Sequence, residues 1–96
     1  MAEAGKGAVK ARITDKLRSG LIPLALDVVD ESHLHAGHAG HDSKGESHFR
    51  VEIVSDAFAG KSRVERHRII NSLLAEELAG GVHALAISAR TPEEAR

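Results

Sequence analysis

The chain has no cysteine, only two residues among Phe, Tyr and Trp, and no apolar run that approaches a membrane span. Without a thiolate, its 96 residues form no disulfide, present no cysteine nucleophile and complete no metal site with their own sulfur. A transmembrane helix needs about 20 consecutive apolar residues. The sequence therefore excludes cysteine chemistry and predicts that no membrane is a partner.

Charge and composition narrow the possibilities further. The formal net charge is −1, so no global basic field attracts nucleic acid, and any such binding must come from a local patch. Hydrophobic residues make up 42% of the chain, enough for the core of one small domain. Residues 1–11 lack the apolar centre of a secretory signal. We expect a single domain over residues 1–96, a flexible tail at residues 1–7 and a cytoplasmic protein.

The first third of the chain shows helical and then strand periodicity. Apolar residues at every fourth position predict a helix over residues 8–21: Val9, Ile13, Leu17 and Leu21. Gly20 is its expected stop, and Pro23 blocks continuation. Alternation over residues 24–29 then predicts a strand. Its expected core-facing residues are Leu24, Leu26 and Val28.

The middle of the chain predicts a loop, a second strand and a turn. Residues 32–45 are mostly Gly, Ala, His, Asp and Ser, and they predict a loop that is long for a link between strands. Alternation returns at residue 48 and predicts a strand ending near Ser55. Its apolar side holds Phe49, Val51 and Ile53. Residues 56–60 predict a turn or one helical turn, anchored in the core by Phe58.

A longer helix is predicted to follow. Ser62 and Glu65 have the spacing of a capping box, in which each side chain satisfies the other residue's backbone donor. The helix is expected to run to about Ala79, and Gly80-Gly81 to end it in a left-handed conformation. Its expected core face begins near Val64 and continues through Ile70, Leu73, Leu74 and Leu78.

Residues 83–89 predict a third strand, and residues 91–94 predict the start of a short terminal turn. The whole order is helix, strand, strand, turn or short helix, long helix, strand. It predicts an α+β fold in which two helices cover one face of a three-stranded sheet.

Histidines are the first group that could carry chemistry. Four of them crowd the predicted loop: His33, His35, His38 and His41. Neutral imidazole is a common ligand of transition metals, yet composition alone favours a solvated loop that binds metal adventitiously. The spacing fits no closed zinc site. His83 stands at a strand entrance, where a histidine more often packs or hydrogen-bonds than binds metal.

Basic residues around the start of the long helix form the second group: Lys61, Arg63, Arg66 and Arg68. They form either a solvated helix face or a nucleic-acid contact, because a helix N-terminus beside cations can hold a phosphate. His67, among them, is expected to be structural. No nucleophile elbow and no phosphate loop is found, so we expect a protein that is not an enzyme.

Six short motifs occur in order along the chain. They are Glu46–Phe49, Val54–Ser55, Phe58-x-Gly60, Arg66–Arg68, Leu74–Leu78 and Val82–Leu85. Their order and spacing, with residues 12–31 as first helix and strand, resemble the BolA family across most of the chain. The resemblance implies one KH-like domain of αββααβ order. It also implies the strand order, which periodicity does not give.

The resemblance also implies a site. BolA-like proteins pair with monothiol glutaredoxins around a shared 2Fe–2S cluster, in iron–sulfur trafficking or iron sensing. Val82–Leu85 matches the motif whose histidine is one cluster ligand, which implies His83. The other family ligand lies in the loop and falls on His35, with His33, His38 or His41 as substitutes. Because such clusters normally need thiolates, the glutaredoxin cysteine and glutathione would supply the rest.

Two alternative functions remain open at this point. Some BolA-like proteins are described as DNA-binding transcriptional regulators, and KH domains grip the nucleic-acid backbone with a GxxG loop. The matching segment, Gly60–Arg63, lacks the second glycine. A stand-alone metal carrier using the loop histidines is the third hypothesis. Alone, the protein is expected to be a monomer or a weak homodimer.

Overall fold

The computed structural model describes residues 7–32 and 47–96. The predicted tail and the loop histidines fall in residues 1–6 and 33–46, outside this part of the chain. The elements are α1 (Ala8–Leu21), β1 (Ala25–Asp30), β2 (His48–Val54), the 3-10 helix η2 (Asp56–Phe58), α2 (Arg63–Leu73), α3 (Ala75–Ala79), β3 (Ala84–Arg90) and α4 (Pro92–Ala95).

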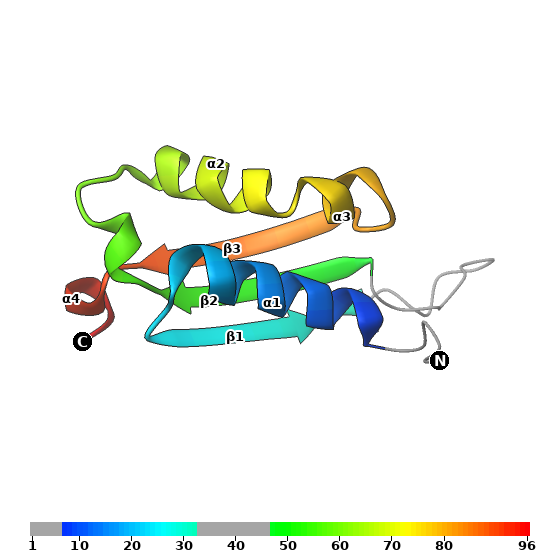
Figure 1. Ribbon diagram of the computed structural model, residues 1–96, viewed down its shortest axis with the longest axis horizontal. Helices are drawn as coiled ribbons and strands as arrows, with labels where there is room; N and C mark the ends of the chain where they lie inside the picture. The colour runs from blue at the N-terminus through cyan, green and yellow to red at the C-terminus, as the bar shows by residue number, and fades with distance from the viewer. Residues whose placement is uncertain (1–6, 33–46) are drawn as a thin grey trace.

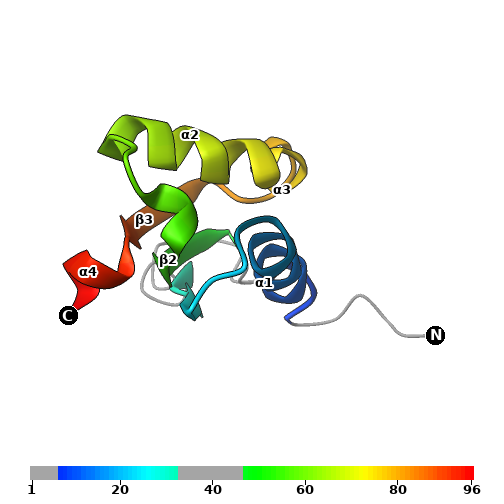
Figure 2. The same cartoon turned by 60° about the vertical axis from the view of Figure 1, so that its left-hand side comes forward.

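The three strands form one sheet in the order β1-β2-β3. β1 and β2 are antiparallel, whereas β2 and β3 are parallel, as the intervening helices require. Figures 1 and 2 show α1 and α2 on the same side of this sheet. The α+β fold and its αββααβ order are therefore confirmed. β1 ends where β2 and β3 begin, at the right of Figure 1, so this end of the sheet gathers the strand entrances.

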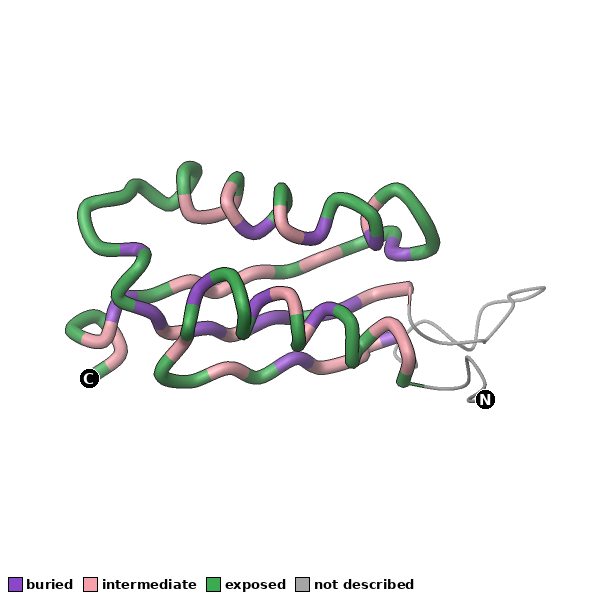
Figure 3. Tube along the Cα trace, viewed as in Figure 1, coloured by how far each residue is buried: buried purple, intermediate pink, exposed green. Residues whose placement is uncertain are grey.

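The core lies between the sheet and the two helices (Figure 3). Alternation along β2 turns Phe49, Val51 and Ile53 inward, as predicted, and all three are buried. Phe58 is fully buried in η2, which confirms it as the anchor of the turn. The remaining buried apolar side chains come mainly from the helices: Ile13, Leu17, Leu21, Val28, Ile70, Leu74 and Val82.

Gly20 does not stop α1, although both bounds of the helix are as predicted. It lies inside the helix, and Ile22 ends it in a left-handed conformation (φ 44°), its N–H donating to the Arg18 carbonyl. A Cβ at Gly20 would lie 2.9 Å from the Leu73 side chain. Gly20 is therefore a packing residue that lets α1 and α2 approach closely.

The long second helix is interrupted, contrary to the prediction. Leu74 leaves helical geometry (φ −104°, ψ 20°) and separates α2 from α3. The predicted left-handed end is also wrong, because Gly80 has φ −90° and Gly81 has no positive φ. Instead, the Glu77 carbonyl accepts hydrogen bonds from the backbone N–H groups of Gly80 (3.2 Å) and Val82 (3.2 Å). These bonds turn the chain toward β3 without a left-handed residue.

Two apolar residues expected in the core lie outside it. Val64, predicted to begin the buried face of α2, is 57% exposed in the first turn of the helix. Leu24, predicted to face the helices, is 67% exposed and precedes the first residue of β1. The capping box at Ser62 and Glu65 is confirmed, and a second one at Thr91 and Glu94 opens α4 where a terminal turn was predicted.

Candidate functional site

His83 stands immediately before β3, at the strand entrances. Its backbone N–H donates to the Ser47 carbonyl at 2.7 Å, and the next residue, Ala84, donates to the same oxygen at 3.2 Å. Val82, on its other side, is buried. The residue is itself exposed. Its backbone is thus held by β2 and by the core, while the imidazole is accessible, which suits a ligand better than a packing residue.

A buried carboxylate supports the turn that leads to His83. Glu77 in α3 is buried, and its carboxylate lies 2.9 Å from Lys16 Nζ and 3.4 Å from Arg12 Nε, both on α1. Burial is the largest single influence and acts to raise the pKa of Glu77, but the hydrogen bonds and charges of Lys16 and Arg12, together with a backbone hydrogen bond, outweigh it, so the pKa is lowered overall. Sequence reasoning missed this role, since a helical glutamate is usually exposed.

The two described residues that border the predicted histidine loop lie together at the strand entrances. His33, His35, His38 and His41 lie outside the described residues, but Ser32 and Ser47 border that segment and are described. The Ser47 N–H donates to Ser32 Oγ at 2.9 Å. Because the Ser47 carbonyl also receives the N–H of His83, both borders of the segment lie beside the strand entrance that carries His83.

A second histidine, missed by the sequence analysis, accompanies His83. His48 is the first residue of β2, and the parallel register pairs it with Ala84. The ring centroids of His48 and His83 are 6.4 Å apart. The alternation of β2 signals that His48 faces away from Phe49, but only the pairing of β2 with β3 places it next to His83.

A complete metal site is not assembled by the described part of the chain. Residues 7–32 and 47–96 contain no group of three or more His, Cys, Asp or Glu side chains arranged to hold an ion. The same residues include no helix long and apolar enough to span a membrane. Any cluster or ion at the strand entrances therefore needs additional ligands, either from residues outside the described ranges or from another molecule.

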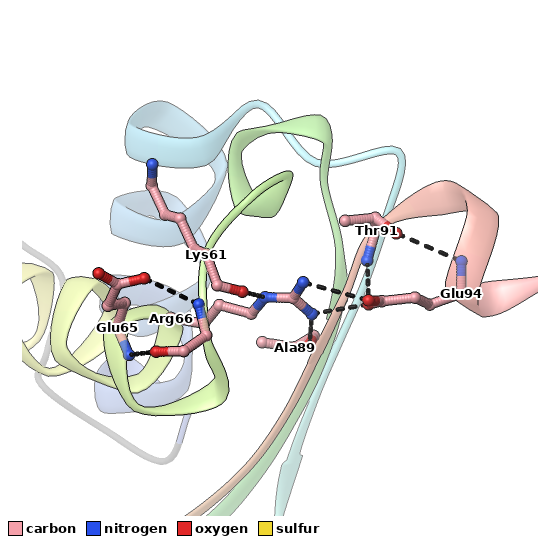
Figure 4. A network of polar contacts seen from close by, with 7 residues as sticks. Lys61, Glu65, Arg66, Ala89, Thr91 and Glu94 are labelled. Carbon is pink, nitrogen blue, oxygen red and sulfur yellow. Dashed lines mark hydrogen bonds and ion pairs between the residues drawn. The ribbon is translucent and has the colours of Figure 1, made fainter.

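The four predicted nucleic-acid residues differ in their surroundings. Lys61, Arg63 and Arg68 are exposed. Arg66 instead joins α2 to α4 and β3 (Figure 4): its guanidinium pairs with Glu94 at 2.6 Å and donates to the Ala89 carbonyl at 3.0 Å. This contact lowers the pKa of Glu94 to about 2, and Arg66 also lies 5.9 Å from the Phe58 ring centroid. Arg66 therefore has a structural role.

Two backbone N–H donors at the start of α2 already have acceptors within the protein. Glu65 N–H donates to Ser62 Oγ at 3.1 Å, and Ser62 N–H donates to Glu65 Oε1 at 2.8 Å, so the capping box uses two donors that a phosphate would need. A shallow depression of about 300 Å³ nearby is lined by Lys61, Glu65, Arg68 and Ile69. The Glu65 carboxylate there partly offsets the two cations.

Together these features define a class: a small α+β domain of αββααβ order, with helices on one face of a three-stranded sheet and histidines at the strand entrances. The family model described as BolA-like protein matches residues 17–94. The chain therefore belongs to the BolA-like protein family.

Several relatives show how widely this domain is used. SufE-like protein 1, chloroplastic/mitochondrial, of Arabidopsis thaliana is 52% identical over 94 residues, which cover 92% of this chain and 25% of that protein. BolA-like protein 1 of Pongo abelii is 51% identical, covering 95% of this chain and 66% of the relative. The DNA-binding transcriptional regulator BolA of Escherichia coli is 49% identical, covering 90% and 78%. The chain thus spans only part of each relative.

The solved structures agree with the fold. The BolA domain of SufE1 from Arabidopsis thaliana has a TM-score of 0.78 and 50% sequence identity, with 98% of both chains covered. BolA1 from the same plant gives a TM-score of 0.79 at 43% identity. Because the relatives include chloroplastic, mitochondrial and bacterial proteins, the cytoplasmic location stays a prediction.

Proposed function

We propose that this protein is an adaptor that shares a 2Fe–2S cluster with a monothiol glutaredoxin and glutathione, in iron–sulfur trafficking or iron sensing. The observation that carries the proposal is His83, an exposed imidazole on a backbone fixed by the Ser47 carbonyl at 2.7 Å. Family membership supports the same ligand. His35 in the loop, or His33, His38 or His41 in its place, is the second proposed ligand.

The donor set of the chain fits a shared cluster and not a self-contained one. Iron–sulfur clusters are normally held by thiolates, and imidazole replaces some of them in Rieske-type centres. The chain offers imidazoles but no cysteine, so the partner and glutathione would supply the sulfur ligands. When bound, the cluster would supply redox and iron–sulfur transfer chemistry. The protein itself contributes an exposed imidazole on a backbone that is held by hydrogen bonds.

Reconstitution tests this proposal directly. Supplied with iron and sulfide but no glutathione, the chain alone should stay colourless, since it has no thiolate to offer. Addition of glutathione and a monothiol glutaredoxin should give a 2Fe–2S absorbance spectrum that differs from that of the glutaredoxin homodimer. A stable cluster on the chain without partner and glutathione, or a mixture whose spectrum equals the homodimer's, would contradict the proposal.

DNA binding is the second candidate function, because the relative from Escherichia coli is named a DNA-binding transcriptional regulator. The exposed cations that could meet phosphates are Lys61, Arg63 and Arg68. Arg66 was also predicted for this role, but its pairing with Glu94 makes it a poor test residue, because its loss would disturb α4 as well.

A salt titration separates this function from the first. If the three exposed cations contact duplex DNA, log affinity should fall with log salt by roughly 0.9 per contact. Arg63→Ala and Arg68→Ala should each lower the slope by about that amount, whereas Arg18→Ala, an exposed arginine on α1, should leave it unchanged. Equal slopes in all variants, or no binding at low salt, would remove the support for this surface.

A further inference from the structure

The outer edge of β1 pairs with no other strand in the described part of the chain. β1 stands at one end of the order β1-β2-β3 and is the lowest strand in Figure 1, where α1 crosses the face of the sheet. Glu31, which continues the antiparallel register, donates its N–H to the His48 carbonyl at 2.7 Å. Because bonded and non-bonded pairs alternate in such a ladder, Leu26 and Val28 direct their N–H and C=O groups away from β2. These groups form a template for a further strand.

The uncovered face of the sheet beside this edge is acidic. Arg50 Nε lies 2.9 Å from Glu31, and Arg50 Nη1 lies 3.1 Å from Glu52. Asp27 is exposed and stands directly opposite Glu52 in the register, and it has no ion-pair partner among the described residues. Like charges directly opposite each other destabilise a sheet. A cation on a strand added beyond β1 would lie across from Asp27 and reduce this repulsion.

Two large apolar side chains are exposed at the start of β1. Ile22 is 76% exposed and Leu24 is 67% exposed. The turn that carries them is held by two hydrogen bonds: Ser55 Oγ donates to the Leu21 carbonyl at 2.6 Å, and the Leu24 N–H donates to the Val54 carbonyl at 2.8 Å. The free edge of β1 therefore ends at a fixed apolar surface.

The backbone of Ile22 is strained, and packing does not compensate for the strain. Its φ of 44° lies in the left-handed region, where a β-branched residue is an outlier. Glycine or asparagine adopts this conformation more readily. Backbone strain of this kind clusters at functional surfaces, and the exposed side chain is the part of Ile22 that another molecule can contact.

We propose that the outer edge of β1 binds an extended segment of a partner protein, which adds a strand antiparallel to β1. The segment carries lysine or arginine opposite Asp27 and, closer to its C-terminus, a large apolar residue beside Leu24 and Ile22. A second copy of this chain fits poorly, because its β1 would bring another Asp27 and Glu31 to the same acidic face. The surface uses neither the proposed cluster ligands nor the cations of α2, so it is independent of both functions proposed above.

The probe is a blocked synthetic peptide in which lysine alternates with threonine and valine and which ends in leucine. It is titrated into the full chain and followed by NMR. The backbone amide signals of Leu26 and Val28 should shift, and their hydrogen exchange should slow in the complex. A matched peptide with glutamate in place of lysine should bind about tenfold more weakly or less. Methylation of the peptide nitrogens that would face β1 should abolish binding, since it removes the donors of the added ladder.

Variants of the chain test the two recognition features separately. Asp27→Lys should weaken the lysine peptide about fivefold, whereas Asp15→Lys, at an exposed aspartate of α1, should leave affinity unchanged. Ile22→Asn should also weaken binding about fivefold, because apolar contact is lost. Its melting temperature should equal or exceed that of the original chain, because the strain is reduced. Val64→Asn, at an exposed valine of α2, is the control for binding.

Several results would overturn the proposal. They are unshifted amides at Leu26 and Val28, equal affinity for the glutamate peptide, unchanged affinity in Asp27→Lys or Ile22→Asn, and a lower melting temperature in Ile22→Asn. Sedimentation of the chain without peptide addresses the remaining occupant. A homodimer in which the same two amides are protected would show that the edge binds a second copy and not a basic partner segment.

Discussion

His83→Ala is expected to abolish the characteristic absorbance spectrum of the mixed complex with glutaredoxin. The backbone of His83 is fixed by β2 and by the buried Val82, so its imidazole is presented at a defined place at the strand entrance. The exposed imidazole contributes little to the core, and the melting temperature of the variant should equal that of the original chain. Absorbance and cluster retention on a desalting column measure the effect.

The control for this experiment is His67→Ala, which removes a histidine from α2 and should leave the spectrum unchanged. A wild-type spectrum in His83→Ala would show that the histidine at the strand entrance is structural. It would contradict the proposed ligand while leaving the fold assignment intact.

The loop histidines should respond differently. The Gly-rich composition of residues 33–46 predicts a segment whose ordering costs conformational entropy, and its neighbouring histidines can replace one another. His35→Ala should therefore only weaken the spectrum, and full loss should need the four-fold change of His33, His35, His38 and His41. If His35→Ala alone is as damaging as the four-fold change, the argument from substitution among these histidines is wrong.

Local patterns predicted most of the fold. The bounds of α1, the alternation of β2 and the capping box at Ser62 and Glu65 depend on residues within a few positions of one another, so periodicity and spacing reveal them. Gly20 was misread because its role depends on Leu73, which a local pattern does not show. The break at Leu74 likewise has no signal in the local pattern, and after it α3 holds Glu77 against Lys16 on α1.

The candidate site was only partly predictable for the same reason. His83 was found through a family motif, and the structure shows how its backbone is held. His48 becomes relevant only because β2 and β3 pair in parallel, and Arg66 becomes structural only because Glu94, 28 residues away, returns to meet it. Contacts between distant residues, which decide both roles, leave no short-range pattern in a single sequence.

The second large expected effect is a loss of stability when a buried residue of α2 is truncated. Ile70 is fully buried on this helix, whereas Val64 on the same helix is 57% exposed. Ile70→Ala leaves a cavity and should lower the free energy of unfolding by about 2–5 kcal/mol. For a domain of this size, whose total stability is typically about 5–15 kcal/mol, that is a large share.

Val64→Ala is the matched change, because it also truncates a β-branched apolar residue of α2. At this mostly exposed position it should alter stability by no more than about 0.5 kcal/mol, since little packing is lost and alanine favours the helix. Urea denaturation of both variants, with the slope m unchanged, measures the difference. A loss at Val64 as large as that at Ile70 would show that the buried face of α2 begins at Val64, as the periodicity predicted, and that the helix is rotated relative to the structure described above.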